Sequence, residues 1–471
     1  RLHPVPMPSQ ATLRSKLLDQ PLFADKIWKL SPEPWPLSEA QVKDLKRIGA
    51  ACLSYHRALE RLYVRSFTDK KILRNREVHA KWVSEYLDRY KPQGLIEHGR
   101  HRSVKGQCPV VLRPDLLITD EGFTMTELDS VPGGVGLTAY LNEVYSEDCS
   151  TLVGSTTMPE RFFAALGRLT PSNRFPLVAI VVSEEAATYR PEFLWLGEKL
   201  RSLGHDVHVV DPGQLMQMGS ETYIPVDGAP RKVDLIYRFF ELFDLANVKG
   251  ADGIFNGVEA GQVALTPPMK AYQEEKLGLA LLHHPMLSEF WKENLPEDHH
   301  EALFRIVPKT WIMEKTDLPP TAVLHAPLVN GRPIRDWTEL AEASQRERNL
   351  IIKASGFHET AWGARSVTLG SDVSREEWLE AIERALDPEN DTFHVMQEYH
   401  KPSRLSHPVY AEDGSVVPAD GRVRLCPYYF VDGDTVELSG VLSTFCPADK
   451  KIIHGMKDAA LLPCKLVSAT A

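Results

Sequence analysis

The sequence predicts a mixed α/β and α+β protein that begins with a mainly helical region. Residues 176–240 hold short apolar runs separated by an amphipathic segment, as in a strand–helix–strand unit of α/β type. Residues after 349 alternate strand, loop, strand, helix and strand, which indicates an antiparallel α+β arrangement. We therefore divide the chain into a helical region over 1–105, a second region over 106–250 and a third over 251–471.

Composition and charge narrow the class of protein. Of the 471 residues, 43% are hydrophobic and 25% are charged, as in ordinary globular proteins. The 54 basic and 64 acidic side chains give a net charge of −10, which argues against nucleic acid or an anionic membrane as the main partner. No apolar run approaches the roughly 20 residues of a membrane-spanning helix. The six cysteines are sparse and lack CxxC spacing, so we expect no zinc site and a reducing, cytoplasmic location.

Helical periodicity dominates the first region after a proline-rich start. Residues 1–37 are expected to be irregular. Ser38 can cap a helix that runs to about Ser66, because apolar residues recur there at three- and four-residue spacing. A second helix is expected over residues 76–90.

The α/β unit begins with a nearly continuous apolar run at 176–182, as in a buried parallel strand. A helix over 192–203 follows, and further strands are expected at 205–210 and 233–239. The stretch 213–232 is expected to be a long connection or a hairpin.

Between 250 and 310, the third region is expected to be helical after Pro267-Pro268, and it changes to strands from about Thr310 onward. Ser374 and Glu377 form a capping-box pattern that opens a helix to Leu386. Strands are expected at 349–354, 365–370, 393–400 and 423–431.

Two short strands around one turn, residues 113–119 and 123–129, carry the clearest chemical signal. The loop between them, 120–122, ends in glycine, which accepts the left-handed conformation of a three-residue hairpin loop. This loop would place Thr119 opposite Phe123. Because side chains alternate along a strand, every second residue of the two strands then projects from one face.

The same register places Asp115 opposite Glu127, and it places Arg113 opposite Asp129. Carboxylates so close repel one another, by roughly 3 kcal/mol for two charges about 5 Å apart at an effective dielectric near 20. A hard divalent cation is the commonest reason for such a cluster, and Mg²⁺ is usually held by one or two carboxylates plus phosphate oxygens. We therefore predict that the three carboxylates bind Mg²⁺ and that Arg113 supplies positive charge for a phosphoryl group or an oxyanion. An exposed hairpin with a polar face is the alternative.

A lysine and a glycine-containing loop indicate a nucleoside triphosphate site. Lys353 ends an apolar strand, and a loop with Gly356 and Gly363 follows it. A lysine on a rigid strand can meet phosphate charge, while the loop offers backbone N–H groups. Lys276, at the start of a helix far upstream, is a second candidate phosphate contact. Isolated lysines on a solvated surface are the alternative interpretation.

The strand that follows the next helix carries a candidate adenine contact. Gln397, Glu398 and Tyr399 resemble a hinge that meets adenine through backbone groups. Together with the two lysines and the glycine-containing loop, this hinge predicts that ATP is bound by the third region.

In their order along the chain, these motifs resemble those of the circularly permuted ATP-grasp ligases, and they are similar to the synthetase domain of glutathionylspermidine synthase. That family carries a strand motif Arg-x-Asp followed by Glu-x-Asn, whose acidic and amide groups hold Mg²⁺. Arg113-Pro-Asp115 and Glu127-Leu-Asp129 stand in the matching positions, with aspartate in place of asparagine. The resemblance spans about residues 108–431.

Three further anchors of the family have counterparts in this chain. Lys276 follows a proline-containing segment, Lys353 precedes the glycine-containing loop, and Gln397-Glu398 stands at the hinge. Each motif is short, so the resemblance depends on the order of all of them.

The chain also departs from the family at identifiable points. Where the family often carries hydroxyl residues that contact a peptide substrate, Ser130 is followed by Val131-Pro-Gly-Gly134, so the resemblance does not extend to glutathione as the substrate. Arg422 and Arg424 are the two candidates for the family's late arginine.

The resemblance implies a circularly permuted ATP-grasp fold. Residues 106–250 would hold the carboxylate hairpin and a pre-ATP-grasp α/β unit, and residues 251–471 would form the nucleotide-binding region. The implied function is an ATP- and Mg²⁺-dependent ligase that joins a small-molecule carboxylate to an amine through an acyl phosphate. Neither substrate is identified by the sequence, and the sequence gives no oligomeric state.

Two other functions stay open. One is an ATP-grasp scaffold that binds nucleotide without catalysis. The other is a dinucleotide-dependent oxidoreductase, because Gly134-Val-Gly136-Leu-Thr-Ala139 copies the dinucleotide-binding fingerprint after a strand. That fingerprint also needs a strand that ends in an acidic residue about 20 residues further on, and residues 150–170 do not provide one.

Overall fold

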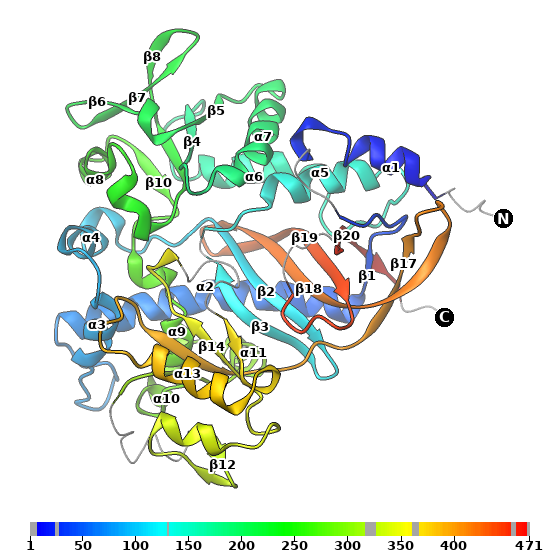
Figure 1. Cartoon of the computed structure of the whole chain (residues 1–471). Coiled ribbons are helices and arrows are strands. Elements are labelled where there is room, and N and C mark those ends of the chain that lie inside the picture. Colours follow the sequence, from blue (N-terminus) through cyan, green and yellow to red (C-terminus); the bar gives the residue numbers. More distant parts are fainter. Residues whose placement is uncertain are drawn as a thin grey trace.

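The computed structural model describes residues 7–23, 28–129, 131–315, 326–359, 367–453 and 458–468. It is a mixed α/β structure with several sheets (Figure 1). A large central sheet lies beside an α/β unit, drawn in green at the top of Figure 1, and a smaller lobe, drawn in yellow at the lower left. Among the described residues, no helix is both long and apolar enough to cross a membrane.

The central sheet gathers strands from both ends of the chain and from the carboxylate hairpin. Its seven strands follow the order β1-β20-β19-β18-β2-β3, with β17 paired to β18. Their bounds are β1 Trp35–Ser38, β2 Val111–Thr119, β3 Gly122–Asp129, β17 Leu405–Tyr410, β18 Val416–Asp432, β19 Thr435–Pro447 and β20 Ala460–Val467. The hairpin is therefore held at one edge of this sheet by the antiparallel pairing of β2 with β18.

Helices cover both faces of the central sheet (Figure 1). The 29-residue helix α2 (Glu39–Phe67) packs on one face, where the hydroxyl of Tyr429 on β18 donates to the carbonyl of Leu45. Helices α5 (Val135–Tyr145) and α6 (Met158–Gly167) lie on the other face.

The N-terminal region confirms one expectation and corrects two. Ser38 and Gln41 form a capping box at the start of α2, as the cap prediction required. The segment expected to be irregular contains helix α1 (Gln10–Lys16) and strand β1. Helix α3 (Lys81–Asp88) is shorter than the predicted helix over 76–90, and α4 (Gln93–Gly99) follows it.

The α/β unit has the predicted strand–helix–strand order. Its four parallel strands follow the order β10-β9-β4-β5. Their bounds are β4 Val178–Val182, β5 Val207–Val210, β9 Leu235–Phe239 and β10 Ala264–Thr266, and the helices are α7 Arg190–Ser202 and α8 Ala251–Glu259. All five residues of β4 are buried, which explains its continuous apolar sequence. The long connection is an antiparallel sheet of β6 Met216–Met218, β7 Glu221–Val226 and β8 Ala229–Lys232.

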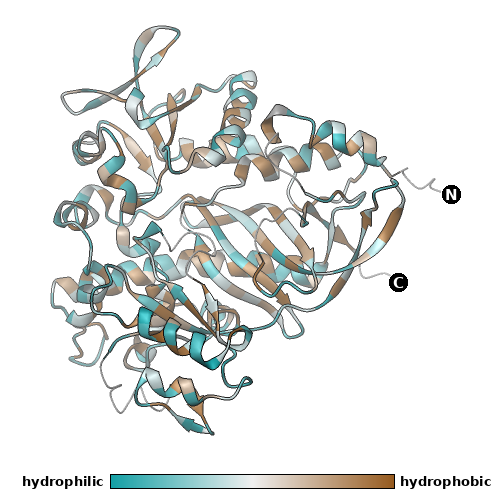
Figure 2. Ribbon diagram, in the orientation of Figure 1, coloured by the Kyte–Doolittle hydropathy of each residue, from teal (hydrophilic) through white to brown (hydrophobic). Residues whose placement is uncertain are grey.

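The smaller lobe is an antiparallel sheet covered by a helix, as predicted, but the strand expected at 423–431 belongs to β18 of the central sheet. Its strands follow the order β11-β16-β14-β15. Their bounds are β11 Thr310–Ile312, β14 Leu350–Ala354, β15 Thr368–Leu369 and β16 His394–Glu398, beside a small hairpin of β12 Leu328–Val329 and β13 Arg332–Pro333. Helix α13 (Arg375–Ala385) covers this sheet and turns a hydrophilic face outward (Figure 2). The segment before the lobe holds α9 Leu277–Leu282, α10 Ser288–Asn294 and α11 Glu297–Ile306.

The open end of the carboxylate hairpin has the predicted register. Asp115 pairs with Glu127, and Arg113 pairs with Asp129. These two pairs have the partners that the sequence predicted.

The closed end of the hairpin differs from the prediction. Thr119 pairs with Gly122 and not with Phe123, so the turn holds two residues and not three. Gly122 adopts a φ of 112°, which favours glycine. The register shifts between Asp115 and Leu116, and this β-bulge compensates for the shorter turn.

The dinucleotide fingerprint has a different structural role. Gly134 adopts a left-handed φ of 93° at the start of α5. In the described part of the chain, the preceding strand β3 pairs only with β2, in an antiparallel arrangement. The parallel βαβ unit that a dinucleotide site requires is therefore not formed by these residues.

Candidate functional site

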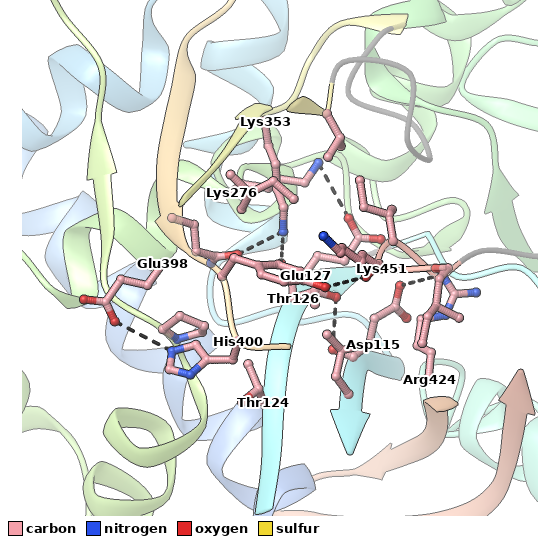
Figure 3. Close-up of a pocket in the computed structure, with 18 residues that line it drawn as sticks. Asp115, Thr124, Thr126, Glu127, Lys276, Lys353, Glu398, His400, Arg424 and Lys451 are labelled. Atoms are coloured by element: carbon pink, nitrogen blue, oxygen red, sulfur yellow. Dashed lines mark hydrogen bonds and ion pairs between the residues drawn. The ribbon is translucent and has the colours of Figure 1, made fainter. Parts of the chain in front are cut away.

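A pocket lies between the carboxylate hairpin and the sheet of the smaller lobe (Figure 3). Its charged and polar lining comes from both sides: Asp115, Thr124, Thr126, Glu127, Lys276, Lys353, Gln397, Glu398, His400, Arg424 and Lys451. Its apolar lining comes from Leu117, Pro308, Ile351, Val367, Tyr399, Ile452 and Ile453. Apolar walls with a few convergent charged groups are typical of a small-molecule site.

The pocket brings together seven of the predicted site residues, from segments far apart in the sequence. They are Asp115, Glu127, Lys276, Lys353, Gln397, Glu398 and Tyr399. Arg113, Asp129 and Gly356 lie outside the lining. Gly363 lies outside the described residues.

Lys353 is buried at the end of β14 and points into the pocket (Figure 3). Its ammonium group donates to the carbonyl oxygen of Thr126 and to Oε1 of Gln397, both at 2.9 Å. Burial lowers the pKa of Lys353 to about 8, although the nearby Glu127 opposes this shift. The amide of Gln397 is itself fixed, because its Nε2 donates to the hydroxyl of Thr310 at 3.0 Å. Gln397 therefore orients the lysine.

Lys276 reaches the same pocket from the start of α9. Its Nζ lies 3.6 Å from Oε2 of Glu127. Lys276 and Lys353 thus lie on one side of Glu127, as Figure 3 shows. Two ammonium groups beside one carboxylate leave a net positive charge, so this part of the pocket can attract a further anionic group.

Asp115 and Glu127 are joined by a hydrogen bond between their carboxyl groups. Burial raises the pKa of Glu127, and the neighbouring Asp115 raises it further, while Lys276 opposes the shift. Burial also acts to raise the pKa of Asp115, but the guanidinium groups of Arg113 and Arg424 bring it below its usual value. Of the two carboxyl groups, Glu127 therefore takes up a proton before Asp115 as the pH falls.

Arg113 lies behind this pair and binds both aspartates. Its Nε lies 3.1 Å from Oδ1 of Asp115, and its NH2 nitrogen lies 3.0 Å from Oδ2 of Asp129. The remaining NH1 nitrogen donates to the carbonyl of Gly133 at 3.0 Å. NH1 and NH2 thus donate hydrogen bonds to the protein, while Nε lies close to Asp115 without a hydrogen bond to it. The guanidinium therefore orders the two aspartates.

Asp129 is separated from the pocket by this contact with Arg113. Burial raises the pKa of Asp129, and the ion pair with Arg113 offsets the shift only in part. Within the described ranges, no group of three or more histidine, cysteine, aspartate or glutamate side chains is arranged to hold a metal ion. Of the three predicted metal ligands, Asp115 and Glu127 line the pocket, and Glu398 adds a third carboxyl group from the hinge.

Arg424 on β18 contributes a guanidinium group to the pocket. The sequence offered both Arg422 and Arg424 as candidates for this role. The NH1 nitrogen of Arg424 lies 3.8 Å from Oδ2 of Asp115 and donates to the carbonyl of Ile453 at 3.1 Å. Its Nε is buried and has no hydrogen-bond partner in the described structure. Arg422 is instead bound to backbone carbonyls, with its Nε donating to Ala448 at 2.7 Å. Of the two candidates, Arg424 alone lines the pocket.

The hinge residues form one wall of the pocket. The backbone N–H of Glu398 donates to the carbonyl of Lys309 at 2.9 Å, and that of Tyr399 donates to Asn349 at 3.1 Å. These two amides are therefore engaged by neighbouring strands. The hydroxyl of Tyr399 donates to the carbonyl of Lys451 at 2.7 Å, so the side chain holds the C-terminal segment against the pocket.

The segment 451–453 closes the pocket and was not predicted. Ile452 packs with Ile351 and Tyr399, while Ile453 packs with Leu117. No element was expected beyond residue 431, so strands β19 and β20 were missed as well. The short segment 451–453 has no periodic pattern of its own. Arg424 was one of two candidates in the sequence, because Arg422 lies two residues before it on the same strand.

Comparison with known proteins gives a fold but no family. No protein-family model and no curated protein sequence matches the chain. The chain shares the fold of a glutathione synthetase-like effector. The match with the apo structure of this effector, from Globodera pallida, covers 93% of this chain and 90% of the effector chain. Its TM-score is 0.53, and 13% of the residues are identical. A structure of a candidate γ-glutamylcysteine synthetase from Methylobacillus flagellatus covers 91% of this chain and 88% of its own at a TM-score of 0.42, also with 13% identity.

Proposed function

We propose that this chain is an ATP- and Mg²⁺-dependent ligase that joins a small-molecule carboxylate to an amine, with a circularly permuted ATP-grasp architecture. The observation that carries the proposal is the convergence of Lys276 and Lys353 on the Asp115–Glu127 pair in one pocket. The order of motifs along the chain and the fold shared with a glutathione synthetase-like effector support it.

The pocket has the charges that a nucleoside triphosphate requires. Lys276, Lys353 and Arg424 supply three cationic groups, and the buried Nε of Arg424 is an unused donor. Charge-assisted contacts of lysine and arginine with phosphate are strong because both partners are ionised. The phosphate charge would also favour the protonated form of Lys353, whose pKa burial lowers to about 8.

The same pocket fits Mg²⁺ through two carboxylates. Asp115 and Glu127 present oxygen ligands on adjacent strands, and Mg²⁺ is usually held by one or two carboxylates plus phosphate oxygens. When bound, Mg²⁺ would neutralise charge on the phosphate oxygens. Glu127 would bind the metal in its ionised form, and Arg113 would keep Asp115 ionised. We propose that Asp129 acts mainly by holding the side chain of Arg113 and less as a metal ligand.

The apolar walls suit an adenine ring. Ile351 and Ile452 belong to one apolar cluster of the lining, and Leu117 and Ile453 belong to another. Such a lining would bury a planar base through apolar contacts. The backbone N–H groups of Glu398 and Tyr399 would not bind the base, because they already donate to carbonyl groups of the protein. Polar recognition of the base would then come from other groups of the hinge.

The proposed reaction needs charge and position more than proton transfer. A carboxylate oxygen of the acid would attack the γ-phosphorus of ATP, and ADP would leave. The amine nitrogen would then attack the acyl carbon, phosphate would leave, and an amide would form. Lys276, Lys353 and Arg424 would hold the phosphates in line and stabilise the negative charge that develops there.

Calorimetry with Mg²⁺ and ATP tests the nucleotide part of the proposal. The wild type should bind, and Lys353→Met should weaken binding by roughly 1.5–3 kcal/mol, the value of a hydrogen bond to a charged group. The exposed Lys292 gives a matched control, since Lys292→Met should leave the affinity unchanged. Absence of binding by the wild type would refute the proposal.

A screen of acids and amines for ATP-dependent phosphate release tests the ligase part. Release that requires one acid and one amine together, with formation of their amide, is expected. ATP binding without turnover across the screen would favour the alternative of a non-catalytic nucleotide-binding scaffold.

A further inference from the structure

Ser355, the first residue after β14, joins the two lysine-bearing segments of the pocket. It is only 1% exposed. Its backbone carbonyl accepts the N–H of Lys276 at 2.9 Å, and its hydroxyl oxygen accepts the N–H of Leu277 at 2.9 Å. The first N–H groups of a helix have no partner within it, so a residue of a distant strand caps helix α9.

Glu275 holds the hydroxyl of Ser355 from the other side. The hydroxyl donates to Oε2 of Glu275, and the ammonium group of Lys91 donates to Oε1 at 2.5 Å. The side chains of Lys91 and Glu275 are only 2% and 4% exposed. Both oxygens of the carboxylate are therefore engaged in a buried network, in which the loss of one member would leave another unpaired.

Close backbone packing at Gly356 fixes the same junction. A Cβ atom on Gly356 would lie 2.5 Å from the carbonyl oxygen of Glu274, so the two segments approach more closely than a side chain permits. The hydroxyl of Thr392 donates to the carbonyl of Gly356 at 2.7 Å and secures the other side of the strand end.

We propose that Ser355 and Glu275 are positioning residues that set the separation of the two ammonium groups without touching the nucleotide. Lys276 directly follows Glu275, and Lys353 precedes Ser355 by two residues. A shift between the two segments therefore moves one lysine relative to the other. This inference rests on the proposed function, since it requires that both lysines bind one phosphate chain.

The two ammonium groups matter only for a ligand with phosphates. Adenosine fills the apolar part of the pocket but offers nothing to the lysines. Loss of the positioning network should therefore weaken ATP binding and leave adenosine binding unchanged. A general loosening of the pocket would weaken both ligands, so the comparison separates the two causes.

The experiment compares Ser355→Ala with Ser66→Ala. Ser66 is a matched control, because its buried hydroxyl also accepts a backbone N–H, from Ser84 at 2.8 Å, and donates to a carbonyl, of Ala80 at 2.7 Å. Ser355→Ala should raise the Kd for Mg²⁺-ATP about tenfold, which corresponds to about 1.4 kcal/mol. The Kd for adenosine should not change, and Ser66→Ala should lower the Tm without an effect on either ligand.

A second variant keeps the test decisive if Ser355→Ala does not fold. Glu275→Gln preserves the shape of the side chain but removes the charge that strengthens the hydrogen bond from Ser355. It should raise the Kd for Mg²⁺-ATP about threefold and leave the Kd for adenosine unchanged.

The outcomes separate this inference from the function on which it rests. If the wild type binds no ATP, the proposed function fails and the positioning role with it. If the wild type binds ATP and the Ser355 and Glu275 variants bind it equally well, only the positioning role is overturned. Equal losses for ATP and adenosine would overturn it as well.

Discussion

Thr126 and Lys353 are joined by a hydrogen bond that depends on a strand irregularity. The ammonium group of Lys353 donates to the carbonyl oxygen of Thr126 at 2.9 Å. Thr126 is the residue without a pairing partner where the register of β2 and β3 shifts. Because a bulged residue lies outside the regular ladder, its carbonyl can accept a side-chain donor from across the pocket.

The stability of the fold should depend on pH through Lys353. Burial lowers its pKa to about 8 from the ordinary value of 10.5. Between these values the unfolded chain binds the additional proton, so the free energy of unfolding rises with pH. Between pH 7 and pH 9.5, the wild type should gain roughly 2 kcal/mol relative to Lys353→Met. Urea unfolding at both pH values measures this, and a constant difference between the two proteins would contradict it.

The affinity for ATP should depend on the same proton. Lys353 must be protonated to meet phosphate charge, so binding above about pH 8 requires proton uptake. The Kd for Mg²⁺-ATP should therefore rise between pH 7.5 and pH 9.5, by less than about tenfold for each pH unit. Calorimetry in buffers of different ionisation enthalpy would detect the proton, and an affinity that stays constant over this range would count against a role for Lys353.

Glu127→Gln should abolish ATP turnover while the fold persists. The amide of glutamine can replace the protonated carboxyl group in the hydrogen bond to Asp115, but it provides no charge for Mg²⁺. Burial raises the pKa of Glu127, so the folded chain keeps a proton that the unfolded chain loses above the ordinary value of 4.5. The wild type should lose stability relative to the variant as the pH rises from 4.5 towards neutrality. Denaturation curves at pH 5 and pH 7, with phosphate release as the activity assay, provide the check.

The two arginines of β18 should give opposite results. Arg424→Met should weaken the binding of Mg²⁺-ATP by about 1.5–3 kcal/mol, because it removes a guanidinium group that lines the pocket. Arg422→Met should instead lower the free energy of unfolding by about 1–3 kcal/mol, since it leaves buried carbonyl groups without donors. Calorimetry and urea unfolding on both variants test the assignment, which a reversed pattern would refute.

Gly356→Ala should destabilise the protein by about 1–3 kcal/mol through overpacking. Its Cβ atom would lie 2.5 Å from the carbonyl oxygen of Glu274, and neither backbone segment can move aside easily. Gly94 provides the control, because a Cβ atom there meets nothing within 4 Å. Thermal unfolding of the two variants should show a clear drop in Tm for Gly356→Ala only.

Local patterns in the sequence were sufficient where the interactions are themselves local. The Ser38 cap depends on a residue three positions away, and the buried strand β4 shows its environment in a continuous apolar run. The pairing of Asp115 with Glu127 was predicted correctly from a loop one residue too long, because the bulge at Thr126 offsets that error. The two-residue turn was not recognised, because Asp120 to Gly122 is compatible with either loop length.

The candidate site depends on contacts that leave no such pattern. Lys276 and Lys353 were identified from the sequence, but their approach to Glu127 is a consequence of the folded chain. Thr126 lies outside the regular β2–β3 pairing only because of a bulge, and the buried network of Ser355 had no sequence signal at all.

The sequence by itself determined the helix caps, the buried strands and the set of charged residues at the hairpin, because these follow from interactions between near neighbours. Only the tertiary structure decided that β18 lies beside the hairpin, that Arg424 and not Arg422 faces the pocket, and that segment 451–453 closes it. Pairing between remote strands is fixed by the burial of shared apolar faces and by the entropy of closing long loops. Neither quantity is encoded in any single stretch of residues.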